Sequence, residues 1–213
     1  FGVADTSFLL IKAEKIYKDI IHGLDRQKKR YMGDIVWTED GGFCESRYDV
    51  TGAWQIRSDA FQLLKEAENE VTNIMFKHRD NARFYVDKYL SKLRRDLLDG
   101  KYREELVLEK GMSKPPTAYA EGNQLRRISE QLLERGEYRP GERLKWVAIS
   151  KKLQNVTFSE NPQKEYALAP DDDLSSLEIT HSGYLYYYER VKKMVDVWVP
   201  QATEQLTMEA FSS

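Results

Sequence analysis

Residues 28–37 read Lys-Lys-Arg-Tyr-Met-Gly-Asp-Ile-Val-Trp, three cations followed by an aromatic residue and a segment with strand composition. We expect a strand over residues 30–37, a hairpin turn at Asp40-Gly41-Gly42 and a returning strand over residues 43–50. Upstream, the β-branched and aromatic bias of residues 8–22 favours another strand, although its periodicity leaves a helix open. This part of the chain therefore predicts a small antiparallel sheet.

Beyond the sheet, apolar residues recur with helical spacing. Ser58 or Asp59 is expected to cap the first helix, and Gly100 to terminate the second. We expect Val86, Leu90, Leu93 and Leu97 to form the buried face of that second helix. The first predicted helix ends near residue 77. The next two span residues 80–99 and 123–135, and the last runs from about residue 180 to Pro200.

Two further segments complete the expected fold. Residues 144–149 have the β-branched and aromatic content of a partly buried edge strand. Residues 154–180 are polar and contain Asp171-Asp172-Asp173, which predicts a long exposed loop. The expected fold class is α+β, a small antiparallel sheet followed by a mainly helical region.

The composition limits the possible functions. The chain has 213 residues, 41% hydrophobic and 12% aromatic, as in a folded protein, and its net charge of −2 provides no global attraction to nucleic acid. Any DNA contact must therefore be local. The single Cys44 excludes an internal disulfide framework and a cysteine-based zinc cluster, and the scattered histidines lack ligand spacing. With no membrane-length apolar run and no signal peptide, we expect a cytoplasmic protein without a membrane partner.

The order of motifs along the chain resembles the late palm and thumb of family B DNA polymerases. Each motif is modest, and the specificity of the resemblance comes from their shared order. The motifs are the run Lys28–Gly33 after a Glu14-Lys15-Ile16-Tyr17 strand, Thr51-Gly52 with Ile56-Arg57-Ser58-Asp59, residues 108–119, residues 132–136, residues 140–144, and Tyr187-Tyr188 leading to Val199-Pro200.

The resemblance implies a division of the chain and of the enzyme. Residues 1–60 are similar to the C-terminal part of the palm, residues 61–200 to the thumb, and residues 201–213 form a tail. The chain looks like the small subunit of a split archaeal DNA-directed DNA polymerase, inactive alone, with no catalytic residue. The large subunit would carry the exonuclease, the fingers and the catalytic aspartates that hold Mg²⁺, and this chain would bind no metal.

The resemblance also implies a DNA-binding set. Lys28, Lys29, Arg30 and Tyr31 would hold the primer strand, and strand alternation would point Lys28 and Arg30 one way and Lys29 and Tyr31 the other. The simpler alternative is a solvated cationic strand.

Four more residues belong to this set. Ser113, Lys114 and Tyr119 are similar to thumb contacts with the duplex backbone. Arg57 is either a phosphate contact or an ion-pair partner of Asp59 or Glu66, and Ser58 stands where the family commonly has another arginine. For Arg126 and Arg127 we favour solvent exposure over DNA contact.

One alignment with the family's metal motif is rejected. Phe1-Gly2-Val3-Ala4-Asp5-Thr6-Ser7 can be laid over Tyr-Gly-Asp-Thr-Asp-Ser, but Val3 then replaces the first aspartate. A catalytic metal needs converging carboxylates, and Asp5 would be alone. We therefore expect a surface or capping role for Asp5.

The tail and the tyrosine-rich helix offer further hypotheses. Gln205, Met208 and Phe211 resemble the motif by which replication proteins bind the sliding clamp, with a short helical turn placing the two apolar residues in one pocket. Tyr184, Tyr186, Tyr187 and Tyr188 could stack bases, but we expect them to pack in a core and keep their hydroxyls in water.

The main hypothesis is a DNA-binding subunit that grips primer-template DNA for a heteromeric polymerase, with the large subunit and the sliding clamp as partners. One alternative is a non-catalytic, degenerate polymerase remnant that acts as an adaptor between DNA and the clamp. Another is a protein-interaction module with no role at DNA, which the net charge of −2 favours.

Overall fold

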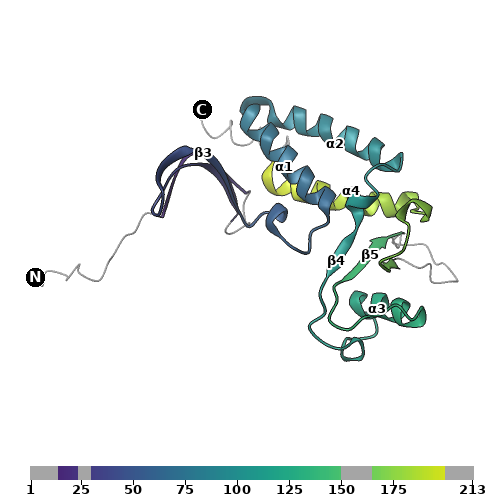
Figure 1. Cartoon of the computed structure of the whole chain (residues 1–213). Helices are drawn as coiled ribbons and strands as arrows, with labels where there is room; N and C mark the ends of the chain where they lie inside the picture. Colours follow the sequence, from purple (N-terminus) through teal and green to yellow (C-terminus); the bar gives the residue numbers. More distant parts are fainter. Residues whose placement is uncertain (1–13, 24–29, 150–164, 200–213) are drawn as a thin grey trace, which may run out of the picture. The chain divides into compact units, whose positions relative to one another are not determined.

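The computed structural model describes residues 14–23, 30–149 and 165–199 (Figure 1). The predicted positions Asp5, Lys28 and Lys29, and the tail motif at residues 205–211, lie outside the described residues. The chain divides into two compact units, Phe1–Ala53 and Trp54–Ser213. Both contain antiparallel strands and the second contains the α-helices, so the α+β class is confirmed.

The residues of the first unit that the structure describes form a three-stranded antiparallel sheet. Its strands β1 (Lys15–His22), β2 (Tyr31–Thr38) and β3 (Gly42–Thr51) lie in that order in the sheet, so the predicted hairpin is confirmed. The turn covers residues 39–41 and is followed by Gly42 with a φ of 65°, which glycine adopts without a steric penalty. Met32 and Ile35 of β2 are fully buried and form the core of this sheet.

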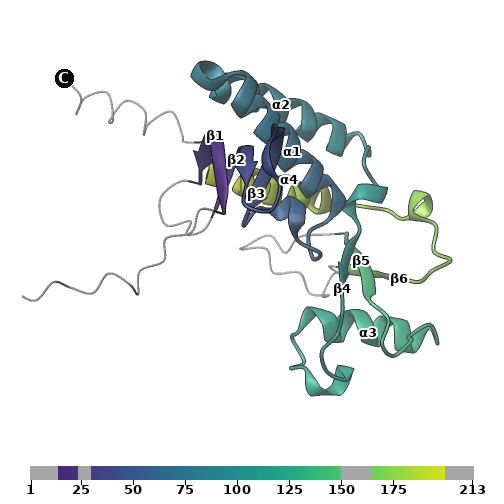
Figure 2. The ribbon, with the colours of Figure 1, turned by 60° about the vertical axis from the view of Figure 1, so that its left-hand side comes forward.

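The described part of the second unit contains four α-helices. The predicted apolar face Val86, Leu90, Leu93 and Leu97 is buried, and Gly100 follows the second helix with a φ of 76°, so both predictions are confirmed. Three of the helices pack on one another, and Figures 1 and 2 show the fourth, α3, beside the strands. The helices are α1 (Gln62–Lys77), α2 (Ala82–Leu98), α3 (Gln124–Glu134) and α4 (His181–Trp198).

The start of α1 differs from the prediction. The residue at the N-cap position is Phe61, which provides no side-chain hydrogen bond, so the expectation of a Ser58 or Asp59 cap is wrong. Asp59 instead accepts two hydrogen bonds from Arg57. Phe61 is buried with its ring centroid 5.1 Å from that of Tyr187, so packing against α4 fixes this end of the helix.

A second antiparallel sheet, β4-β5-β6, was only partly predicted. Its strands are β4 (Leu108–Lys110), β5 (Leu144–Ala148) and β6 (Glu165–Leu168). β5 lies between the other two, so the expectation of an edge strand is wrong. The expected loop over residues 154–180 is wrong where β6 forms. This strand has only four residues, and contacts with α3 bury its first residue, Glu165.

Short 3₁₀ helices connect these elements. They are η2 (Trp54–Ile56), η3 (Arg79–Asn81), η4 (Glu104–Leu106), η5 (Pro116–Ala118) and η6 (Leu174–Ser176). Within the described residues, no helix is long and apolar enough to cross a membrane.

The tyrosines of α4 confirm the expectation of core packing for two positions. Tyr184 and Tyr187 are buried, so neither ring is available to a base. The Tyr187 hydroxyl accepts a hydrogen bond from the Ala148 backbone N–H at 2.7 Å, so the expectation of a wet hydroxyl is wrong at this position. The contact joins α4 to β5. Burial raises the pKa of Tyr187, which keeps the phenol protonated.

Candidate nucleic-acid interface

On the first sheet, Tyr31 belongs to a cluster of side chains around an aromatic pair. Its ring meets that of Tyr17 edge to face, with centroids 5.9 Å apart. The Tyr17 hydroxyl donates to the Asp49 carboxylate, which also lies 2.9 Å from Lys15 Nζ. Burial, and then the hydrogen bond with Asp49, raise the pKa of Tyr17. Tyr31 is therefore held by a ring that is itself fixed to β3.

Gly33 makes this arrangement possible. A Cβ atom there would lie 2.5 Å from the Asp19 backbone oxygen and 2.8 Å from Cδ1 of Tyr17. The pairing of β1 with β2 shifts register between Tyr17 and Asp19, which brings the β1 backbone close to Gly33. The glycine in the run Lys28–Gly33 thus allows the Tyr17 ring to lie on β2.

Arg30 lies directly before β2. Its backbone oxygen accepts a hydrogen bond from the Gly23 N–H at 2.9 Å, which ties together the two ends of the β1–β2 connection. Its side chain is half-buried. Lys28 and Lys29 lie outside the described residues, so the predicted alternation of the four side chains stays a prediction.

In the second unit, Arg57 forms the ion pair that the sequence left open. Its Nε and Nη2 each donate to the Asp59 carboxylate at 2.9 Å, and the guanidinium lies 4.3 Å from the Trp54 ring centroid. The hydrogen bonds from Arg57 lower the pKa of Asp59. Glu66, the other expected partner, accepts from Gln62 instead. Contact between Arg57 and a phosphate stays a prediction.

The structure brings Ser113, Lys114 and Tyr119 together in one loop. The Tyr119 hydroxyl accepts the Ser113 backbone N–H at 3.0 Å and lies 3.3 Å from Ser113 Oγ. The hydrogen bond with the Ser113 hydroxyl, and then the one with the Ser113 backbone N–H, lower the pKa of Tyr119. The Pro115-Pro116 pair leads into η5 between them, and Lys114 is exposed. The loop is closed by its own hydrogen bonds and presents an ammonium group to solvent.

Arg126 and Arg127 are half-buried and have partners within the protein, so the expectation of solvent exposure is wrong. Arg126 Nε donates to Glu130 at 2.7 Å, and its Nη1 donates to the Tyr119 backbone oxygen at 3.1 Å. Arg127 Nη2 donates at 2.8 Å to Glu165, which is buried at the start of β6. The two side chains bind α3 to the 113–119 loop and to the second sheet.

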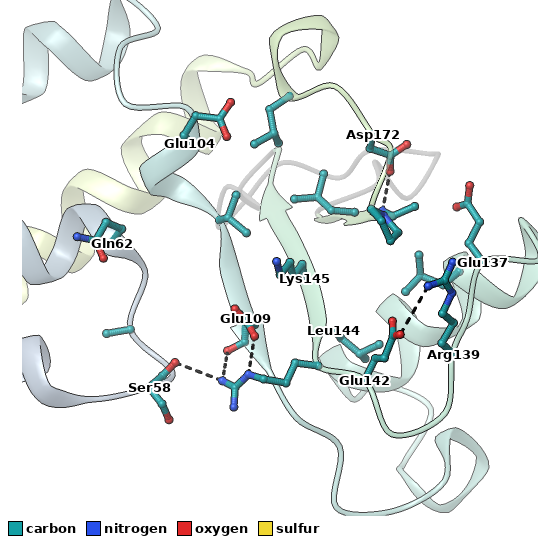
Figure 3. A pocket seen from close by; sticks show the side chains of 18 of the residues that line it. Ser58, Gln62, Glu104, Glu109, Glu137, Arg139, Glu142, Leu144, Lys145 and Asp172 are labelled. Atoms are coloured by element: carbon teal, nitrogen blue, oxygen red, sulfur yellow. Dashed lines mark hydrogen bonds and ion pairs between the residues drawn. The ribbon is translucent and has the colours of Figure 1, made fainter.

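A cavity of about 610 Å³ lies beside the paired strands β4 and β5 (Figure 3). Arg143 Nε lies 2.6 Å from the Glu109 carboxylate, and Arg143 Nη2 donates to the Ser58 backbone oxygen. Arg139 and Glu142 form another ion pair at its rim. Because carboxylates outnumber cations in its lining, the cavity is a poor site for a phosphate backbone. Within the described part of the chain, no group of three acidic, histidine or cysteine side chains could hold a metal ion.

Comparisons with known proteins give these surfaces a context. No protein-family model matches the sequence. Over 141 residues, 64% of the chain, the sequence is 33% identical to DNA polymerase 2 of Aeropyrum pernix. The structure is similar to that of the family B DNA polymerase from the hyperthermophilic archaeon Pyrobaculum calidifontis, with a TM-score of 0.61 and 22% identity over 89% of the chain. The chain is similar in sequence to part of one archaeal DNA polymerase and in fold to part of another.

The chain spans only a fraction of these polymerases. It covers 16% of the Aeropyrum protein and 22% of the Pyrobaculum chain. The likeness to the Pyrobaculum structure extends over most of the chain and concerns the fold.

Sequence reasoning missed the residues that support the predicted DNA contacts of this polymerase-related chain. Asp49 and Lys15 are 34 residues apart and meet only because β1 and β3 flank β2. The one local signal was Tyr17 in the expected first strand. A glycine within a strand leaves room for a large side chain from the neighbouring strand, and Gly33 leaves that room for the Tyr17 ring.

Proposed function

We propose that this chain is the DNA-gripping small subunit of a split DNA-directed DNA polymerase. The observation that carries the proposal is the similarity to archaeal polymerases in sequence and in fold, in a chain that bears two candidate DNA-contact segments, Arg30-Tyr31 and the 113–119 loop. The Tyr31 ring, which packs on Tyr17, and the exposed Lys114 ammonium support the proposal. Both groups suit contacts with the sugar and phosphate of DNA, which do not depend on the base sequence.

The catalytic part is assigned to a larger partner subunit. The described residues offer no carboxylate cluster that fits Mg²⁺, so the proposal places Mg²⁺ on the partner. This chain's role is to hold the primer-template duplex, so that the primer terminus meets the partner's catalytic carboxylates in a productive geometry. The proposed partners are the large polymerase subunit, primer-template DNA and a sliding clamp.

The grip is tested in the complex captured with the tagged chain from native lysate. Lys29→Ala combined with Arg30→Ala should weaken primer-template binding and flatten its salt dependence, because each phosphate contact adds roughly 0.9 to the slope of log affinity against log salt. Association with the large subunit should be intact. Unchanged affinity and slope would contradict the primer-grip assignment.

The loop is tested with a matched pair of lysines. Lys114→Ala should weaken duplex binding, whereas Lys192→Ala, on an exposed position of α4, should not. Equal effects of the two substitutions would mean that only overall charge matters.

The alternative function is that of a degenerate polymerase remnant that connects DNA to the sliding clamp. The clamp-like residues Gln205, Met208 and Phe211 are the observation in its favour. If the captured complex extends a primer in a metal-dependent reaction, the split-enzyme proposal stands; if the chain binds DNA and clamp without extension, the adaptor replaces it. Phe211→Ala should abolish clamp-stimulated synthesis and spare basal synthesis.

A further inference from the structure

The α1–α2 hairpin carries a cleft that the proposed primer and loop contacts do not use. Its volume is about 450 Å³, and the two helices that line it lie side by side in Figures 1 and 2. On α2 the lining residues Tyr85, Lys88, Lys92 and Arg95 recur at intervals of three and four. Residues at this spacing share one face of a helix. One stripe of α2 therefore faces the cleft.

The charged groups of the cleft are mostly cationic. Lys77, Lys88, Lys92 and Arg95 line it together with a single carboxylate, that of Glu70. Lys92 lies 3.7 Å from Asp96, whereas the other three cations are exposed and have no ion-pair partner among the described residues. On a chain with a net charge of −2, this is a local positive surface.

Aromatic rings lie among these cations. The His78 and Tyr85 rings are stacked, with centroids 3.9 Å apart and an interplanar angle of 17°, and Tyr89 lines the cleft one turn further along α2. All three rings are half-exposed. Nucleic-acid bases stack on such rings regardless of sequence, while cations beside them follow the phosphates. An acidic peptide would use the cations and leave the rings without a role.

We propose that the α1–α2 cleft is a separate binding site for single-stranded nucleic acid. Lys77, Lys88 and Arg95 hold the phosphates, and the His78–Tyr85 pair stacks an unpaired base. Bases in a duplex are already stacked on one another, so the rings select a single strand. The site goes beyond the proposed function, which assigns the duplex grip to other segments.

The first test compares two neighbouring arginines. The full chain is titrated with a fluorescent oligothymidylate of about ten nucleotides, near the usual site size of such proteins, at low salt. Arg95→Glu should lower the affinity about tenfold, because it removes a phosphate contact and adds a repulsive charge. Arg94→Glu makes the same change on an exposed residue that does not line the cleft. An equal loss in both variants would overturn the proposal.

The second test concerns the rings and the class of ligand. Tyr85→Ala should weaken oligothymidylate binding about tenfold but leave binding of an abasic oligonucleotide nearly unchanged. Equal losses for the two probes would overturn the stacking. If polyglutamate competes as well as oligothymidylate at equal charge, the cleft is a protein-docking surface and the proposal fails.

The outcomes separate this site from the duplex grip. Primer-template duplex binding is measured in parallel on the same preparations. Failure to bind duplex with normal oligothymidylate binding overturns the proposed function alone. Normal duplex binding with no oligothymidylate affinity overturns this inference alone.

Discussion

Tyr187 and Tyr184 form a matched pair that tests how α4 is held against the second sheet. Both are buried on the same face of α4, three positions apart. The Tyr187 hydroxyl accepts the Ala148 N–H at 2.7 Å, whereas the Tyr184 hydroxyl is buried with no hydrogen-bond partner among the described residues. Replacing either by Phe removes one oxygen atom and keeps the ring.

The two substitutions should differ in free energy. Tyr187→Phe leaves a buried N–H without an acceptor, which costs about 1–3 kcal/mol. On folding, the Tyr184 hydroxyl loses its hydrogen bonds to water and gains no partner in the protein. Tyr184→Phe removes this hydroxyl, so the free energy of unfolding should be unchanged or slightly higher. For a chain of this size, each kcal/mol shifts Tm by about 2–4 °C.

The assay is urea unfolding followed by tryptophan fluorescence. Trp146 and Trp198 are buried in the same unit and report its transition. The slope of the free energy against urea should match that of wild type, so that the midpoint shift reports stability. Equal losses in the two variants, or a loss below about 0.5 kcal/mol for Tyr187→Phe, would refute the hydrogen bond as the source.

Two further predictions concern other parts of the chain. Gly33→Ala should destabilise the first sheet by about 1–3 kcal/mol, because the new Cβ meets the Asp19 backbone oxygen, and faster amide exchange over residues 15–38 would show it. Asp96→Asn should lower the unfolding midpoint more at pH 7 than at pH 3, because the hydrogen bond from Lys101 lowers the pKa of Asp96. That stability is present above the ordinary aspartate pKa near ~4 and is lost as pH falls through the lowered value, so a constant gap would contradict it.

The sequence predicted the elements that carry a strong local pattern. The face Val86 to Leu97 specified α2 and Gly100 marked its end, because periodicity and positive φ are properties of neighbouring residues. β4 and β6 were missed because they lack such a local pattern. They have three and four residues, too few to show alternation, and they are specified by pairing with β5.

The candidate site divides in the same way. The run at Arg30-Tyr31 and the cluster of Ser113, Lys114 and Tyr119 could be found from motif order. The Tyr17–Asp49 hydrogen bond could not, because it spans 32 residues and depends on a register shift in β1. Residues that touch a ligand recur in motifs, whereas those that position them depend on tertiary contacts.

The roles of the cations explain why charge alone misled the predictions for Arg126 and Arg127. Several arginines hold the second unit together: Arg103 Nη1 donates to the carbonyls of Leu174, Ser175 and Leu177, and Arg135 reaches four partners in and around β6. A guanidinium fork suits such multiple contacts, whereas an ammonium group acts as a hydrated point charge.

Exchange of the two cations therefore separates structure from binding. Arg135→Lys keeps the charge but cannot reproduce contacts with Tyr166, Ala167, Glu137 and Asp172, so it should cost about 1–3 kcal/mol of stability. Lys114→Arg keeps an exposed positive charge in the 113–119 loop. It should leave the unfolding midpoint unchanged and the affinity for duplex within about twofold of wild type. Urea midpoints and duplex titrations measure the two effects. If Arg135→Lys unfolds at the wild-type midpoint, the arginine contacts do not hold β6 in place.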